Sequence, residues 1–69
     1  MLNIGDEITI DWDGPSKIRI LESYPDTKEF LIGRLDGNDK LCHPDRIENW
    51  MVIDQNELLN AEWDMLYQR

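Results

Sequence analysis

Apolar and polar residues alternate strictly near the start of the chain, which predicts a β-strand over Glu7 to Trp12 with its apolar side chains on one face. A turn over Asp13 to Ser16 leads into a second strand, Lys17 to Ile20. The alternation breaks at Leu21, where two apolar residues adjoin, as they often do at a β-bulge. The first third of the chain therefore indicates a hairpin whose second strand bends.

The middle of the chain predicts a second hairpin. Glu29 to Leu35 has consecutive apolar residues, so we expect a third strand that is buried on both faces for part of its length. Asp36 to Asp39 is a turn sequence whose Asp-Gly and Asn residues accept the positive φ of tight hairpins. Lys40 to His43 then returns as a short fourth strand.

The last third predicts a helical turn over Pro44 to Ile47, a fifth strand over Trp50 to Ile53, and a helix. Asp54 and Glu57 have the spacing of a capping box that starts this helix. The apolar stripe of this helix predicts about three turns that end near Tyr67. The stripe consists of Leu58, Leu59, Trp63, Met65 and Leu66, and Leu59, Trp63 and Leu66 lie in one line along the helix.

This order of elements resembles the SH3-like small β-barrel, the architecture of Tudor and KOW modules. The matching segments are Ile4 to Ile10, Ile32 to Gly37 and His43 to Ile47, and the resemblance covers Asn3 to about Ile53. It implies a mainly β fold: a five-stranded SH3-like barrel over 1–53 with a C-terminal amphipathic α-helix over 54–69 packed on it as one domain. Tudor modules that bind methylated cations carry aromatic residues in loops that have none here.

Composition narrows the class of protein further. The chain has 69 residues and one cysteine, Cys42, so an internal disulfide is excluded. No apolar run approaches the roughly 18 residues of a membrane span, and the first residues lack the pattern of a signal peptide. We therefore expect a single small domain in the cytoplasm with no membrane partner.

The formal net charge of −8 lies entirely at the two ends of the chain. Residues 1–13 hold four acids and no base, residues 14–43 hold five of each, and residues 44–69 hold six acids and two bases. If the fold brings the two acidic ends together, they form one negatively charged surface. That surface would repel nucleic acid and anionic lipid. The simpler alternative is that the acids only keep a small protein in solution.

The sequence does not favour a metal site or a catalytic site. Cys42, His43 and Asp45 are the only clustered metal-ligand types, and adjacent residues on a strand point to opposite faces, so neither a zinc site nor a Cys–His pair fits. Asp11 and Asp13 share a strand face, but so small a barrel offers little volume to shelter a carboxylate pair. We expect no catalytic residue, metal or cofactor.

The function that fits best is a non-enzymatic acidic protein-binding module that regulates or inhibits a partner with a basic surface. Trp50, together with Tyr24 and Tyr67, is the candidate aromatic anchor, although tryptophan in so short a chain also serves as core. The candidate partner-binding residues are Asp6, Glu7, Asp11, Asp13, Trp50, Glu57, Glu62 and Asp64.

Three further possibilities stay open. The acids can imitate nucleic-acid phosphates, as in small phage or mobile-element proteins that block the groove of a host polymerase or defence nuclease. The C-terminal helix can cover the barrel or pair two copies as a homodimer. Direct nucleic-acid binding, which the net charge disfavours, would have to use five bases of the middle segment, Lys17, Arg19, Lys28, Arg34 and Lys40.

Overall fold

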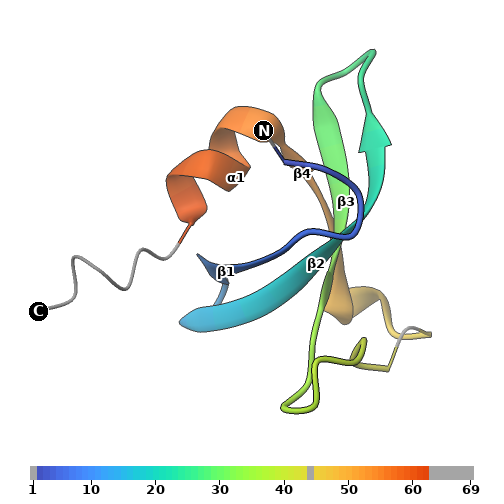
Figure 1. Ribbon diagram of the computed structural model, residues 1–69, viewed down its shortest axis with the longest axis vertical. Helices are drawn as coiled ribbons and strands as arrows, with labels where there is room; N and C mark the ends of the chain where they lie inside the picture. Colours follow the sequence, from blue (N-terminus) through green and yellow to red (C-terminus); the bar gives the residue numbers. More distant parts are fainter. Residues whose placement is uncertain (1, 44, 63–69) are drawn as a thin grey trace, which may run out of the picture.

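The computed structural model describes residues 2–43 and 45–62. They form four antiparallel strands in one open sheet, a short 3-10 helix and one α-helix (Figure 1). The strands follow chain order, β1-β2-β3-β4, so the fold is mainly β, as the alternation predicts. The elements are β1 (Glu7–Asp11), β2 (Pro15–Tyr24), β3 (Glu29–Arg34), η1 (Ile47–Asn49), β4 (Trp50–Asp54) and α1 (Gln55–Ala61).

The first hairpin joins β1 to β2 through a tight turn. Asp13 and Gly14 both adopt left-handed φ, 56° and 94°, and the Trp12 N–H donates to the Gly14 carbonyl at 2.8 Å. Glycine adopts this conformation without strain and aspartate tolerates it better than most residues, which is why Asp-Gly stands here. β2 begins at Pro15, earlier than predicted, and continues to Tyr24.

The predicted bulge at Leu21 is confirmed. The β2–β3 register shifts between Ile20, which lies opposite Ile32, and Glu22, which lies opposite Leu31. Leu21 is therefore the extra residue of the bulge, and β2 continues past it as one strand. Because the extra residue changes the alternation, Ile20 faces the core while Glu22 lies on the opposite face, which we call the outer face.

The core lies between the inner face of the sheet and α1. Isoleucine supplies most of it because β-branched side chains suit the pleated surface of a sheet. Trp12 and Met51 pack against its edge as half-buried residues. The buried core residues are Ile10, Ile18, Ile20, Phe30, Ile32, Ile53 and Leu58.

The predicted fourth strand, Lys40–His43, is present only as an isolated bridge between Leu41 and Leu35. The chain starts to return, because the Cys42 N–H donates to the Arg34 carbonyl at 2.9 Å. His43 then takes a left-handed φ of 30°, which turns the backbone away from β3. Over the described residues the sheet therefore has four strands and is open, where the sequence predicts a five-stranded barrel.

The turn between Leu35 and Leu41 differs in detail from its prediction. The residue with positive φ is Asp39, at 61°, while Gly37 is not in the left-handed region. The helical turn predicted over Pro44 to Ile47 lies later, at Ile47–Asn49, with Pro44 outside the described residues.

α1 corrects the predicted helix in its cap and its buried face. Asp54 Oδ1 accepts from the Asn56 N–H at 2.8 Å, rather than from Glu57. The helix has seven residues and ends at Ala61, not near Tyr67. Leu58 is fully buried and Leu59 is 56% exposed, because α1 follows β4 without a linker and that junction sets which side meets the core.

Two further features of the C-terminal part bear on the predictions. An isolated bridge between Ile10 and Glu62 joins the residue after α1 to β1, and Figure 1 shows α1 beside β1. Trp63, Met65, Leu66 and Tyr67 lie outside the described residues. Among the described residues, no helix has the length and hydropathy that a bilayer crossing needs.

Candidate functional site

The outer face of β3 and β4 is apolar where a sheet surface usually carries polar side chains. Val52 lies opposite Leu31, and Trp50 lies opposite Gly33. Cross-strand partners project from the same face, so these four positions share the outer face, while their neighbours in sequence supply the core. Val52 is 52% exposed and Trp50 is half-buried.

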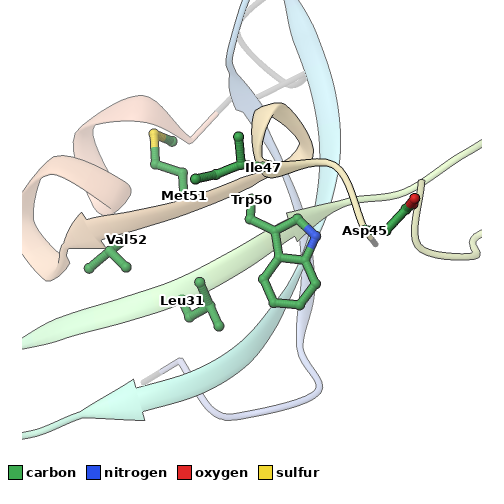
Figure 2. A pocket seen from close by; sticks show the side chains of 6 residues that line it. All are labelled: Leu31, Asp45, Ile47, Trp50, Met51 and Val52. Atoms are coloured by element: carbon green, nitrogen blue, oxygen red, sulfur yellow. The ribbon is translucent and has the colours of Figure 1, made fainter. Parts of the chain in front are cut away.

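An open pocket of about 520 Å³ lies on this surface. Figure 2 shows Leu31, Val52 and the Trp50 indole projecting together from the two strands, with the indole nitrogen on the side of Asp45. Ile47, at the start of η1, also lines the pocket and is 88% exposed. Figure 2 draws the Ile47 side chain with that of Met51, on the other side of β4 from the Trp50 indole, so exposed apolar surface continues across this strand. Exposed apolar surface next to a half-buried tryptophan is typical of a protein contact surface.

Gly33 allows the apolar surface to continue beyond the pocket. A Cβ atom at this position would lie 2.9 Å from Leu41 Cδ2 and 3.0 Å from Leu21 Cδ1. The two leucines thus cover the glycine closely, and Leu21 comes from the bulge while Leu41 comes from the abbreviated return after β3. The bulge and the bridge are therefore what bring this second apolar layer onto the outer face.

Carboxylates surround the apolar surface, and we call Glu22, Glu29, Asp45 and Asp54 the acidic rim. Glu22 lies opposite Leu31, Glu29 lies opposite Asp54, and Asp45 lines the pocket. None of the four forms an ion pair with another described residue. The rim therefore leaves negative charge uncompensated beside exposed apolar side chains.

The N-terminal acids from the sequence analysis lie elsewhere, and two of them are paired. Glu7 Oε2 accepts from Arg19 Nη2 at 2.7 Å, and Asp13 Oδ2 lies 3.5 Å from Arg34 Nη2. The other two accept backbone hydrogen bonds in local turns. The Asn3 N–H donates to Asp6 Oδ2 at 2.8 Å, and the Gly14 N–H donates to Asp11 Oδ1 at 3.3 Å.

The C-terminal acids meet the N-terminal ones in part. The bridge between Glu62 and Ile10 places Glu62 beside the strand that carries Asp11. Glu57 is exposed in the first turn of α1, and Asp64 lies outside the described residues. The structure brings Glu62 to β1, but it groups none of these acids with Trp50, whose pocket is lined by Asp45 of the acidic rim.

The bases of the middle segment are largely occupied by acids. A hydrogen bond from Lys17 Nζ to Asp39 Oδ1, 2.7 Å long, raises the pKa of the Lys17 ammonium. Arg19 donates to Glu7 and to the Asp39 carbonyl, the latter at 2.8 Å. With Arg34 beside Asp13, three of the five bases carry a compensating carboxylate.

The residues considered for chemistry do not converge. Cys42 is a free, half-buried thiol, and His43 is exposed. Within residues 2–43 and 45–62, no three His, Cys, Asp or Glu side chains are grouped as metal ligands. The arrangement offers a contact surface and no assembled set of ligands or reacting groups in this part of the chain.

Comparisons of the chain with protein-family models, curated proteins and solved structures find no match. The site therefore rests on its geometry. The sequence pattern indicated Trp50 but not its apolar neighbours or the acidic rim. One signal was available: the consecutive apolar residues of Glu29 to Leu35 indicated that β3 has two apolar faces.

Proposed function

We propose that this chain is a non-enzymatic protein-binding module that docks through its outer face onto a basic partner surface and so regulates or inhibits that partner. The observation that carries the proposal is the pocket beside Trp50, with exposed Ile47 and Val52 near carboxylates that form no ion pair with another described residue. Apolar surface with an aromatic anchor supplies affinity once the proteins have met.

The acidic rim gives the second part of the mechanism. Negative charge at the edge of an interface speeds the encounter with a positively charged partner and fixes its orientation, and added salt screens this attraction. Association should therefore slow with rising salt, while dissociation should depend mainly on Trp50. A partner that presents an apolar side chain between Lys or Arg residues matches both features.

Affinity capture from a cell lysate at two salt concentrations, with Trp50→Ala beside the wild type, tests the proposal. We expect a specific partner whose capture weakens at least tenfold with Trp50→Ala, about 1.4 kcal/mol of binding free energy. Leu59→Ala is the control because Leu59 is an exposed apolar residue that lies on α1, away from the pocket beside Trp50. Equal capture by wild type and Trp50→Ala, with both folded by circular dichroism, contradicts the proposal.

The second candidate is an acidic mimic of nucleic acid that blocks the groove of a nucleic-acid-binding enzyme. The bridge between Glu62 and Ile10 favours it, because it joins the acidic C-terminal part to acidic β1. The pairing of Glu7 with Arg19 and of Asp13 with Arg34 weakens it, because paired carboxylates imitate phosphates poorly. Glu57→Gln with Glu62→Gln should abolish binding by a mimic and leave docking through Trp50 unchanged.

For the architecture, we propose a partly open SH3-like barrel, in which the edge of β4 away from β3 stays free. The bulged, ten-residue β2 and the 3-10 turn directly before β4 support the proposal. A solution structure in which Leu41 and Cys42 pair with β3 beyond the single bridge would agree with it. An open end at that position in solution would contradict it.

A further inference from the structure

β4 is an outermost strand of the sheet, and one of its two edges is open. It pairs with β3 on one side, and no described residue pairs with it on the other. An open strand edge presents unpaired N–H and C=O groups in a row, which another extended chain can bind. The open edge of β4 borders the pocket, since Trp50 and Val52 belong to both.

Two hydrogen bonds determine which groups of β4 point to the open edge. The Gln55 N–H donates to the Lys28 carbonyl at 2.9 Å, and the Trp50 N–H donates to the Ile47 carbonyl. Residue pairs in an antiparallel ladder alternate between bonded and non-bonded. Counting from the bonded Lys28–Gln55 pair makes Val52 a non-bonded partner of Leu31, so both the N–H and the C=O of Val52 face away from β3.

We propose that an extended segment of a basic partner adds to β4 as a further strand and exchanges two backbone hydrogen bonds with Val52. The inference rests on the proposed function and specifies how the partner binds. The segment's residue opposite Val52 projects its side chain from the outer face, beside the pocket, and should be apolar. The residues two positions away on either side lie opposite Trp50 and Asp54.

Charge decides the chemistry of those two flanking residues. Asp54 lies in one row with Glu29, so a Lys or Arg opposite it faces two carboxylates. At the other end a guanidinium can stack on the Trp50 indole and reach toward Asp45. The favoured segment is therefore basic, then apolar, then basic at alternate positions.

The same charges argue against a second copy of this chain on the edge. Each copy carries a formal net charge of −8, and pairing two β4 edges would bring two acidic rims together. Like charges brought into an interface oppose association. A basic partner segment meets no such repulsion.

A synthetic peptide with blocked ends and the sequence Thr-Arg-Thr-Leu-Thr-Arg-Thr serves as the probe, because an antiparallel pairing that puts its leucine opposite Val52 puts an arginine opposite both Trp50 and Asp54. We expect it to bind and to slow hydrogen exchange of the Val52 amide. N-methylation of the leucine nitrogen should weaken binding by about tenfold, because it removes a hydrogen bond to Val52 and blocks close approach. N-methylation of a neighbouring threonine, whose N–H points away from β4, is the matched control and should have less effect.

Each other outcome overturns the added strand. The added strand is contradicted if the leucine-methylated peptide binds as tightly as the unmethylated one, if hydrogen exchange of the Val52 amide does not change, or if no binding is seen at about 1 mM peptide. It is also contradicted if the Val52 amide already exchanges slowly in the free protein and that protein sediments as a dimer. The proposed function fails separately, if Trp50→Ala captures the partner as well as the wild type. If peptide binding depends on Trp50 but leaves hydrogen exchange of the Val52 amide unchanged, only the added strand is contradicted and the proposed function stands.

Discussion

The guanidinium of Arg34 lies over the Trp12 ring, 4.2 Å from the ring centre. Trp12 follows β1 and Arg34 ends β3, so this cation–π contact closes one end of the core across the intervening strand. Arg34 Nε is buried and has no hydrogen-bond partner among the described residues, and Asp13 lies 3.5 Å from Nη2. Stacking on the indole is therefore the main contact that positions this side chain.

A double-mutant cycle measures that contact. We expect Arg34→Met and Trp12→Leu to be coupled by about 0.5–2 kcal/mol in the free energy of unfolding, the range for cation–π pairs from exposed to desolvated. Urea denaturation of the four proteins provides the value. Asp13→Asn is the control: its side chain is 90% exposed, so its ion pair should contribute less than about 1 kcal/mol. Additive single effects would contradict the contact.

The buried face of α1 can be checked with two adjacent leucines. Leu58→Ala should destabilise the protein by about 2–5 kcal/mol, because it removes a fully buried side chain and leaves a cavity. Leu59→Ala should change stability by less than about 0.5 kcal/mol, because that side chain is 56% exposed. Thermal or urea unfolding of both variants distinguishes this orientation of α1 from one in which Leu59 faces the core.

Gly33 should tolerate alanine better than valine. An alanine Cβ meets only the ends of two flexible leucine side chains, whereas valine adds two further methyl groups to the same space. We expect Gly33→Val to cost about 1–3 kcal/mol through overpacking. Gly37→Ala is the matched control, because a Cβ there meets nothing within 4 Å and its φ is not left-handed. A tolerated valine would mean that Leu21 and Leu41 do not cover this glycine.

Asp36 makes stability depend on pH. Its carboxylate accepts backbone N–H groups from Lys40 at 3.1 Å and Asn38 at 2.7 Å, which lowers its pKa below the ordinary value of 3.8. A carboxyl whose pKa is lower in the folded state stabilises the fold at pH above 3.8, and this contribution disappears as pH falls through the folded pKa.

Asp36→Asn should therefore be less stable than wild type at about pH 7, and the difference should shrink below about pH 4. Urea unfolding across this range gives the comparison. Asp26→Asn is the control, because Asp26 lies in the exposed turn between β2 and β3 and forms no ion pair within the described residues. A difference that is constant with pH would mean that the carboxylate charge plays no part in holding the turn.

Several features of the fold could be predicted from local pattern. Strict alternation located β1, the adjacent apolar pair at Leu21 located the bulge, and the acid before α1 located its cap. Each depends on residues close in sequence, whose side-chain period of two or 3.6 is set by backbone geometry. The early start of β2 at Pro15 was not predicted, nor was the reduction of the fourth strand to a single bridge, because His43 and Pro15 act through backbone conformation.

The candidate site was predictable only in its anchor. Trp50 was recognisable as a large aromatic in a short strand, but its neighbours come from β3, η1 and the loop before η1. Which side chains share a face with Trp50 depends on strand register, and the bulge at Leu21 changes that register midway along β2. The acidic residues chosen from the sequence were selected by charge segment, whereas the rim is assembled across three strands and a loop.

By itself, the sequence determined that this is a small acidic β protein with a tryptophan before a capped helix and its acidic excess at the two ends. Tertiary structure decided which charges remain effective: Arg19 and Arg34 of the balanced middle neutralise Glu7 and Asp13, while Glu22 and Glu29 of that same segment form no ion pair in the part of the chain that the structure describes. It also decided that Leu58 rather than Leu59 is buried. The physical reason is that local patterns fix the period of an element, but only contacts between distant segments fix its phase, its partners and its free edges.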